Sequence, residues 1–445
     1  MTFLCYDLEN SHPEHHMKSV VIIGGGFAGI RAAKALASAP VSVTLIDRKN
    51  HHTFQPLLYQ VATATLSPAD IAQPIRAILQ KQKNVCVIMD EVTSIDSDKR
   101  LVHLKNENVL AYDYLILATG ATHSYFGHDE FERFAPGLKT IEDALQIRGR
   151  TFSAFEEAER EMVRTGTHKP LNFVVIGGGP TGVEVAGALA DTCHVYLRDE
   201  FRHIDTTKAR VILLEAMPKV LGPYPEDLSA SALKQLKDCG VEVMTGTQVT
   251  DVQDSYVMTS AGRIDAAVII WAAGVQASPL GKALGFPVDR RGCVMVDQYL
   301  NPPEHPEVFI CGDLAHFEQD GRQLPGVAQT AMQMGVHAAE IIKLDLENKP
   351  RKSFRYFDKG DMATIGRMRA VAKIKWPFHA HAGGFAAWAS WLIIHIFFLI
   401  GLRNRFLVFW QWVWTFTARQ RGAQLITDME IVCDHEPTMP LNKSA

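Results

Sequence analysis

The sequence predicts an α/β fold made of two similar parallel-sheet domains, followed by a helical C-terminal region. A short apolar run leads into a glycine-rich turn and a helical pattern near residue 24, and the same succession returns near residue 177. Continuous apolar runs of this kind are typical of strands buried on both faces of a parallel sheet. From residue 385 to residue 418 the chain is largely apolar and aromatic, without glycine or proline except at residue 401.

The composition is that of a folded protein with unevenly distributed charge. The 445 residues are 47% hydrophobic and 21% charged, which excludes a disordered chain and allows two or three domains. The net charge is −4, yet residues 351–421 hold 12 Lys and Arg against only Asp358 and Asp361. That local excess of +10 predicts that the late region faces something anionic, either nucleic acid or a membrane surface.

The cysteines and the N-terminus give only simple expectations. No two of the seven cysteines are spaced as Cys-x-x-Cys, so no metal site or disulfide framework is predicted, and we expect small buried side chains in a reducing compartment. Residues 1–16 contain three acids and no apolar stretch. They are expected to form a flexible tail and not a secretory signal, with Met17 as a candidate start.

The first glycine-rich turn has the context of a dinucleotide-binding loop. Gly24, Gly26 and Gly29 follow the apolar run 20–23 and open a helical pattern. In such a loop the first glycine permits a tight turn, the second lets the backbone approach a pyrophosphate, and the third lets helix and strand pack closely. The helix N-terminus adds N–H donors for phosphate. A second strand ends at Asp47, 18 residues after Gly29, where a ribose-binding carboxylate is expected.

The second glycine-rich turn repeats the pattern with Gly177, Gly179 and Gly182. The next strong strand ends at Glu215, 33 residues after Gly182, and the polar stretch 191–208 accounts for the extra length as an insertion. A glutamate at this position can accept hydrogen bonds from both ribose hydroxyls and would repel a 2′-phosphate. The sequence therefore favours NADH over NADPH.

Two such loops in one chain predict two bound dinucleotides. Two nicotinamides would have no chemistry to perform together, whereas a flavin and a nicotinamide can exchange a hydride. The expected cofactors are therefore FAD at the first loop and NADH at the second.

Further segments resemble the two-dinucleotide-binding-domain flavoproteins, a superfamily that includes glutathione reductase. They are YDYLILATG at 112–120, VIIWAAG at 268–274 and VFICGD at 308–313. The resemblance implies that Thr119, Gly120 and Gly274 lie at the connections between the FAD and NAD domains. It also implies that Asp313 binds the ribityl and phosphate region of the flavin.

Within this superfamily the chain is most similar to type II NADH:quinone oxidoreductases, which do not pump protons. FQPLLY at 54–59 resembles the segment beside the flavin ring, and AQTAMQ at 328–333 matches the quinone-site pattern A-Q-x-A-x-Q. Residues 48–85 lack the cysteine pair of thiol–disulfide relatives, so electrons must pass directly to a second substrate. The resemblance covers about residues 17–430 and implies a respiratory-chain enzyme that passes two electrons from NADH through FAD to a ubiquinone- or menaquinone-class quinone.

Residues 327–343 are expected to form a helix, on which Gln329 and Gln333 share one face. Each amide can donate to a quinone carbonyl or accept from a quinol hydroxyl. Spacing alone would leave both residues as surface glutamines, and it is the resemblance that implies a catalytic place in the quinone site.

Three other charged residues are candidates for the site. Glu184 follows Gly182 in the first part of a helix, where an acid complements the helix dipole. The resemblance implies a catalytic role for it near the nicotinamide. Lys373 and Lys375 are both candidates to reach the quinone region, and the sequence does not distinguish them.

Residues 385–402 and 406–418 are two apolar stretches bordered by arginines. As a helix the first is about 27 Å long, just short of the ~30 Å hydrocarbon core of a bilayer, and the second is about 20 Å long. A single span would place Arg403 and Arg405 on the far side, against the positive-inside tendency. Two helices lying in the membrane interface fit better, with tryptophans at the headgroup boundary. A buried core hairpin or a dimer interface is the alternative, and nucleic-acid binding is not expected because the basic residues flank apolar stretches.

The expected organisation is an FAD domain split around an NADH domain, followed by a membrane-binding region. The boundaries are 17–135 and 285–350 for the two FAD parts, 136–284 for the NADH domain and 351–445 for the membrane-anchoring region. We expect a monotopic membrane protein, on the cytoplasmic face of the inner membrane if bacterial, with a homodimer as a further option. Because both loops precede residue 376, residues 376–421 are expected to be dispensable for FAD binding. The alternatives are a sulfide:quinone or ferredoxin-type reductase and a nonenzymatic NADH sensor.

Overall fold

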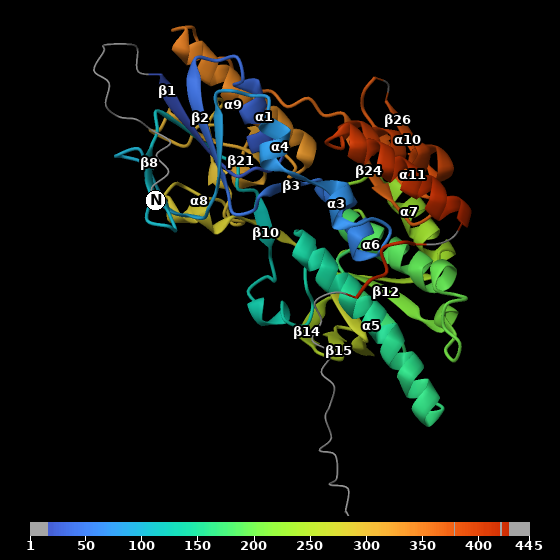
Figure 1. Ribbon diagram of the computed structural model, residues 1–445. Helices are drawn as coiled ribbons and strands as arrows, with labels where there is room; N and C mark the ends of the chain where they lie inside the picture. The colour runs from blue at the N-terminus through green and yellow to red at the C-terminus, as the bar shows by residue number, and fades with distance from the viewer. Residues whose placement is uncertain (1–16, 378, 419–420, 427–445) are drawn as a thin grey trace, which may run out of the picture.

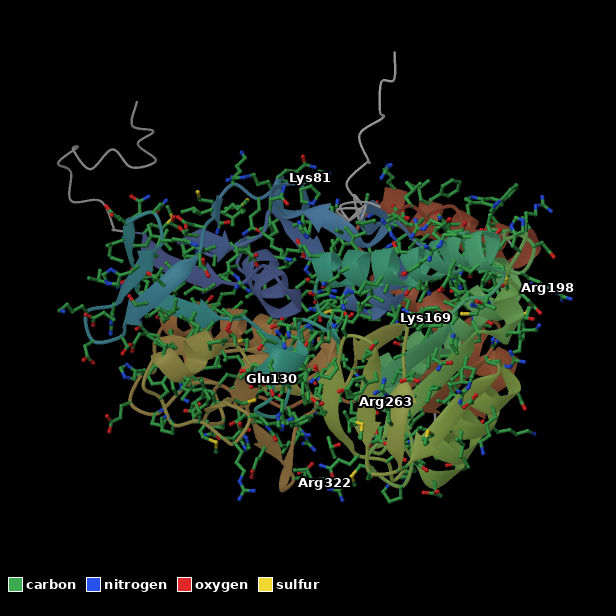
Figure 2. All side chains as sticks on the ribbon, turned by 90° about the horizontal axis from the view of Figure 1, so that it is seen from below. Lys81, Glu130, Lys169, Arg198, Arg263 and Arg322 are labelled. Atoms are coloured by element: carbon green, nitrogen blue, oxygen red, sulfur yellow. The ribbon has the colours of Figure 1, made fainter. Side chains whose placement is uncertain are left out.

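The computed structural model describes residues 17–377, 379–418 and 421–426. Two parallel sheets form the body of the molecule, and a small antiparallel sheet with two helices covers one side of it (Figure 1). Charged side chains such as Lys81, Arg198 and Arg322 project from the outside (Figure 2). The tail expected at residues 1–16 lies outside the described residues.

The first sheet has five parallel strands. In spatial order they are β20 (Val308–Ile310), β9 (Tyr114–Leu117), β1 (Lys18–Ile23), β2 (Val41–Asp47) and β5 (Val85–Met89). Ile22 pairs with Leu45 on one side and Ile116 on the other, and all three side chains are buried. Helices α1 (Phe27–Ala35) and α9 (Ala328–Leu346) pack against each other beside this sheet. Strand β20 and helix α9 follow the second sheet in the sequence, whereas the other strands of the first sheet precede it. The first sheet is therefore built from two separate stretches of the chain.

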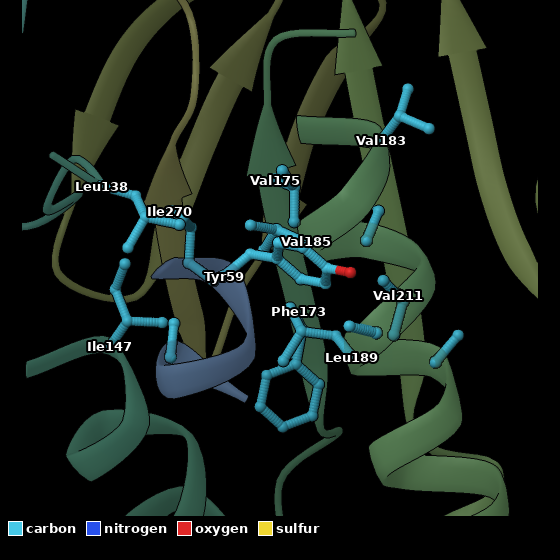
Figure 3. Close-up of a cluster of buried hydrophobic side chains, with 14 of the residues drawn as sticks. Tyr59, Leu138, Ile147, Phe173, Val175, Val183, Val185, Leu189, Val211 and Ile270 are labelled. Carbon is cyan, nitrogen blue, oxygen red and sulfur yellow. The ribbon is translucent and has the colours of Figure 1, made fainter. Parts of the chain in front are cut away.

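The second sheet has four parallel strands and carries the second glycine loop. In spatial order they are β13 (Val241–Thr245), β12 (Arg210–Glu215), β11 (Asn172–Ile176) and β17 (Val268–Trp271). Phe173, Val175, Val211 and Ile270 point from these strands into one apolar cluster (Figure 3). Its helices are α5 (Ile141–Thr165), α6 (Pro180–Asp191) and α7 (Glu226–Asp238). A π-helical turn at Thr192–Tyr196 continues α6 and begins the insertion predicted between the loop and Glu215.

The remaining elements are shorter. One three-stranded antiparallel sheet consists of β6 (Val92–Asp96), β7 (Leu101–Leu104) and β8 (Val109–Ala111), and another consists of β14 (Val249–Gln253), β15 (Tyr256–Thr259) and β16 (Gly262–Asp265). The two-stranded pairs are β3 (His51–Thr53) with β4 (Ala72–Pro74), β10 (Ala121–His123) with β18 (Val275–Ala277), β19 (Val294–Met295) with β21 (Ala315–His316), and β22 (Glu318–Gln319) with β23 (Arg322–Gln323). The short α-helices are α2 (Leu58–Ala62), α3 (Pro68–Ile71), α4 (Ile75–Leu79) and α8 (Pro279–Ala283).

The C-terminal region is an antiparallel sheet followed by two helices. The strands are β24 (Gly360–Thr364), β25 (Ala370–Ile374) and β26 (Ala380–Gly383), and the helices are α10 (Gly384–Phe398) and α11 (Leu402–Ala418). The break between the helices comes at 399–401, so Arg403 and Arg405 lie inside α11 and do not separate two helices as the sequence suggested. Among the residues described, no helix is both long enough and apolar enough to cross a bilayer.

The two C-terminal helices are part of the main hydrophobic core. Trp391 of α10 and Val408 and Trp412 of α11 are buried in the same cluster as the strands of the second sheet. The Trp412 Nε1 donates to Oε1 of Gln60 over 2.7 Å. Removal of residues 376–421 would therefore open the core, which argues against the expectation that this region is dispensable for FAD binding.

The described cysteines follow the expectation of burial only in part. Cys193, Cys293 and Cys311 are buried and Cys239 is half-buried, but Cys86 is exposed. Cys86 lies on β5, an edge strand of the first sheet, on which Met89 is also exposed.

Candidate active site

The first glycine loop has the shape that a dinucleotide loop requires. Gly24 has a φ of +104°, and a Cβ there would lie 2.3 Å from the Ala118 carbonyl oxygen. A Cβ on Gly29 would lie 1.8 Å from the Gly24 carbonyl oxygen, so helix α1 can approach β1 only through glycine. The nearest atom to a Cβ on Gly26 is 4.0 Å away, which leaves that side of the loop open for a ligand.

Asp47 ties the end of β2 to this loop. Its Oδ2 accepts a hydrogen bond from the Gly25 N–H over 2.6 Å, and its Oδ1 accepts one from the Lys49 N–H over 2.7 Å. These bonds hold the carboxylate beside the loop, where a ribose hydroxyl would reach it.

The second loop reproduces the same geometry residue by residue. Gly177 has a φ of +111°, and a Cβ on Gly182 would lie 1.8 Å from the Gly177 carbonyl oxygen. The Gly178 N–H donates to Oε2 of Glu215 over 2.6 Å, as Gly25 does to Asp47, and the Met217 N–H donates to Oε1 over 2.7 Å. Around Gly179 no atom lies within 4 Å of an added Cβ, so this loop also leaves room for a pyrophosphate.

A cavity of about 2550 Å³ joins the first loop to α6, α9 and α10. The predicted site residues that line it are Gly24, Gly26, Asp47, Thr119, Gly120, Glu184, Asp313, Gln329 and Gln333. Those outside its lining are Gly29, Gly177, Gly179, Gly182, Glu215 and Gly274. Gly29 is buried by helix packing. Gly177 and Gly182 are buried as well, whereas Pro180 and Thr181, which lie between them in the sequence, are exposed and line the cavity. Gly274 has a φ of +79° and leads into Val275 and Gln276 at the cavity wall.

Several polar groups in the cavity wall fit FAD. The buried Oγ1 of Thr119 and Nε2 of His52 have no hydrogen-bond partner among the described residues. His52 is held there by a 2.9 Å contact between its Nδ1 and the Gly25 carbonyl oxygen. The Oδ2 of Asp313 lies 3.9 Å from the ammonium nitrogen of Lys139, and its Oδ1 would lie 3.2 Å from a Cβ on Gly326, two residues before α9. An extended dinucleotide would satisfy these groups and fill the open side of the first loop.

Glu184 projects from α6 into the same cavity. Burial raises the pKa of its carboxyl to about 8, and only one hydrogen bond, from the Thr364 N–H to its Oε1 over 3.3 Å, opposes that rise. The Thr364 hydroxyl is 2.8 Å from the Tyr59 hydroxyl, which also accepts a hydrogen bond from the Gln60 amide over 3.0 Å. A polar chain thus runs from the cavity at Glu184 to the buried indole of Trp412.

Gln329 and Gln333 share one face of α9, as predicted, and both face the cavity. Their amides are already engaged with the strand segment opposite. Gln329 Nε2 donates to the Gly360 carbonyl over 2.9 Å. Gln333 makes a reciprocal pair with Phe357, donating to its carbonyl over 3.0 Å and accepting from its N–H over 2.9 Å. The sequence suggested amides free to bind a quinone, whereas in this structure they hold the segment that leads into β24.

The two candidate lysines differ in their surroundings. Lys375 is paired with Asp358. Lys373 lines the cavity and stands opposite Asp361 in the register of β24 and β25. Burial, and secondly the charge of Asp358, raises the pKa of Asp361. The geometry therefore favours Lys373 as the lysine available to a ligand.

Sequence reasoning missed three residues of this site. His52 and Tyr59 lie in or beside the FQPLLY segment, but their roles depend on contacts with Gly25 and Thr364 that no local pattern shows. His395 is the one ionisable side chain within the apolar stretch 385–402, and that isolation was the available signal.

Comparison with known proteins separates the candidate families. The family model "Pyridine nucleotide-disulphide oxidoreductase" matches residues 18–335, and the model "NDH2 C-terminal domain" matches residues 359–420. The type II NADH:quinone oxidoreductase Ndh of Mycobacterium tuberculosis is 45% identical over 433 residues, which cover 94% of this chain and 92% of that protein. This chain belongs to the type II NADH:quinone oxidoreductase family. A second M. tuberculosis member, NdhA, is 45% identical over 430 residues.

Solved structures agree on the fold of this family. The NDH2 structure from Plasmodium falciparum in complex with NADH has a TM-score of 0.81 at 21% identity and covers 92% of this chain and 99% of that one. A sulfide:quinone oxidoreductase from Aquifex aeolicus has a TM-score of 0.70 at 20% identity. The architecture is thus shared with the alternative enzyme class, and it is sequence identity that places the chain among type II NADH:quinone oxidoreductases. FAD and NADH are the cofactors of this family, as predicted, and the two loops fit them.

Proposed function

We propose that this chain oxidises NADH and reduces a ubiquinone- or menaquinone-class quinone, with FAD between them. The observation that carries the proposal is one cavity whose wall includes the FAD loop, Glu184 from the NADH-binding half, and side chains of the C-terminal helix α10. Bound FAD supplies the two-electron chemistry that connects the two substrates. The protein holds both substrates against FAD and excludes water from between FAD and each substrate.

Each half of the site has its own recognition residues. On the NADH side, Gly177, Gly179 and Gly182 leave space for the pyrophosphate, and Glu215 accepts hydrogen bonds from the ribose hydroxyls. On the FAD side, Asp47 and Asp313 serve the ribose and ribityl regions, next to Thr119 and Gly120. These assignments rest on the loop geometry and cavity lining described above.

Gln329 and Gln333 would act on the quinone side in two ways. They hold residues 357–360 against α9 through both ends of their amides, and the Lys359 N–H donates to Oε1 of Gln329 over 3.4 Å. They also line the cavity, so a quinone could exchange with the backbone for one of these hydrogen bonds. Lys373 is the proposed cationic neighbour of this region.

The C-terminal helices would bring the quinone in from a membrane. Their exposed apolar side chains are Phe385, Ile393, Ile394, Phe397, Leu402, Phe406, Phe409, Trp410 and Trp414. Helices that expose many apolar side chains, tryptophans among them, are typical of monotopic proteins that lie in the membrane interface. Ile393 and Phe397 also line the cavity, so the proposed lipid-facing surface and the quinone path are continuous. We place the protein at the cytoplasmic face of the inner membrane in a bacterium, and keep a homodimer and the domain boundaries given above as predictions.

The test uses the purified, FAD-loaded full-length chain. We expect rapid bleaching of the flavin by NADH, slow bleaching by NADPH, and steady NADH oxidation with ubiquinone-1 or menadione. Flotation with vesicles of phosphatidylglycerol and phosphatidylethanolamine should carry the protein upward. Fast flavin bleaching without quinone turnover would instead identify a nonenzymatic NADH sensor, and turnover that requires sulfide would identify the other reductase class.

A further inference from the structure

His395 places a polar ring in an otherwise apolar part of the cavity wall. It lies in the last turn of α10, whose 15 residues are mostly aliphatic and aromatic. Phe54, from the segment beside the first loop, and Phe398 line the cavity with it. Neither the quinone-site pattern nor the roles assigned above use this histidine.

The hydrogen bond of His395 determines which ring nitrogen carries the proton. Its Nδ1 lies 2.7 Å from the Trp391 carbonyl oxygen. Because a carbonyl oxygen can only accept, Nδ1 must be the donor, and in the neutral ring Nε2 is then an acceptor. Among the residues that the structure describes, Nε2 has no hydrogen-bond partner.

Aromatic neighbours hold the ring in this orientation. The imidazole stacks on Trp391 with ring centroids 3.9 Å apart and an interplanar angle of 22°. Its edge meets Phe54 at 6.2 Å and 80°. Trp391 is itself buried against Tyr59 and Trp412, so the acceptor is carried by a rigid cluster and not by a mobile side chain.

The apolar surroundings also keep the ring uncharged. Burial lowers the pKa of His395 to about 4, and the hydrogen bond to the Trp391 carbonyl only partly offsets this effect. At neutral pH the ring therefore offers a lone pair and no second N–H.

We propose that Nε2 of His395 accepts a hydrogen bond from a hydroxyl group of the quinol product. The proposal rests on quinone reduction as the function of the cavity. A quinone has only carbonyl acceptors and cannot make this bond, whereas a quinol hydroxyl can. His395 would thus bind the reduced form in preference to the oxidised form, next to the exposed residues Ile393 and Phe397 through which the product leaves. No proton is transferred to the ring.

Three substitutions separate the acceptor from the shape of the side chain. His395→Phe keeps a ring against Trp391 but removes both nitrogens. His395→Asn can still donate to the Trp391 carbonyl but does not reach the Nε2 position. His395→Gln can place its carbonyl oxygen near the Nε2 position and should restore the interaction. His381→Ala is the control, because His381 lies in the same region, is bonded to Asp227 and does not line the cavity.

The measurements are anaerobic titrations of the FAD-loaded variants with ubiquinol-1 and ubiquinone-1, together with stopped-flow bleaching of the flavin by NADH. In His395→Phe and His395→Asn we expect ubiquinol-1 affinity to fall by about 3- to 10-fold, as for loss of one neutral hydrogen bond, with ubiquinone-1 affinity changing less than twofold. Flavin bleaching should stay at the wild-type rate, and His395→Gln should recover most of the quinol affinity.

Equal losses for quinol and quinone, or no loss for either, would overturn the proposal. If His395→Phe fails to retain FAD, His395→Asn decides the question, since it keeps the bond to Trp391. A failure of the proposed function itself would give a different result. NADH would still bleach the flavin of the wild-type protein, but the protein would neither turn over with ubiquinone-1 nor bind either of its forms.

Discussion

Glu184 is a carboxylic acid that folding makes harder to ionise. Its pKa is about 8 in the folded protein against an ordinary value of 4.5. Between these pH values the folded state binds more protons than the unfolded state, so stability falls as pH rises through this window. The melting temperature of the FAD-loaded enzyme without NADH should therefore fall less steeply over this range in Glu184→Gln than in the wild type. If the melting temperatures of the two proteins changed with pH in the same way, the pKa of Glu184 would not be raised by folding.

Glu215 is the residue that should discriminate the two nicotinamide dinucleotides. Its carboxylate is held at the loop by the N–H groups of Gly178 and Met217, which donate to its two oxygens. A glutamine has nearly the same shape, but it removes the charge and keeps only one of the two acceptor oxygens. Glu215→Gln should lower the KM for NADPH and narrow the preference for NADH by about tenfold, which corresponds to ~1.4 kcal/mol. Steady-state kinetics with both dinucleotides check this. Glu242→Gln, at an exposed acid on the adjacent strand β13, should leave the preference unchanged.

Gln333 can be tested against a glutamine that makes the same contacts elsewhere. Gln319 donates to the Tyr356 carbonyl over 3.3 Å and accepts from the Tyr356 N–H over 2.8 Å, as Gln333 does with Phe357, but it does not line the cavity. Gln333→Ala should lower quinone kcat/KM by roughly 3- to 10-fold and leave flavin bleaching by NADH unchanged. Gln319→Ala should change neither. Equal effects of the two substitutions would mean that Gln333 only supports the backbone.

At the scale of the element, α11 has two faces with different tasks. Asn404, Val408, Trp412 and Thr415 recur at helical spacing and are buried. Trp410 and Trp414 lie one turn apart on the other side, with 52% and 60% of their surfaces exposed, against 3% for Trp412. The sequence shows three tryptophans in alternate positions and gives no reason to separate them.

This division predicts different results for substitutions only two residues apart. Trp410→Ser combined with Trp414→Ser should lower the partition coefficient for anionic vesicles at least tenfold, because two apolar anchors are lost, and leave the melting temperature nearly unchanged. Trp412→Phe should lower the melting temperature, since Gln60 loses its indole donor, and leave vesicle binding unchanged. Vesicle flotation and thermal unfolding measure the two effects. Unaltered flotation of the double variant would remove α11 from the proposed membrane surface.

At the scale of the whole molecule, Arg421 near the end of the described chain contacts two segments that lie far before it in the sequence. Its guanidinium donates to the Thr63 carbonyl and to the Thr192 hydroxyl, and it lies 4.0 Å from the centre of the Tyr196 ring. Arg421→Met should lower the free energy of unfolding by about 2–4 kcal/mol, because buried acceptors lose a charged donor. Denaturant titration checks this, with the exposed Arg403→Met as control. The same unfolding midpoint in both variants would show that Arg421 is not a structural tie.

Sequence analysis predicted those parts of the molecule whose structure is determined by residues close together in the sequence. Gly24 and Gly177 are followed at fixed distances by their helices, and Asp47 and Glu215 end the next strands, so each loop could be reconstructed from its own segment. The family resemblance then located Gln329 as part of the cavity wall. The occupied amides of the glutamines, the inward face of α11 and the position of His395 beside Phe54 were not predictable, because each depends on contacts between segments that are distant in sequence.

The hydrogen bond between Gln60 and Trp412 also sets an order of events during synthesis. The two residues are 352 positions apart, so at ~5–20 residues per second about 20–70 s separate their appearance at the ribosome. During that interval α2, which belongs to the FAD half, lacks the indole and the guanidinium that cover it in the finished protein. The nascent chain can form its glycine loops early, but it closes its core only when α10 and α11 emerge. The core is thus completed at nearly the same time as the surface that we propose to contact the membrane.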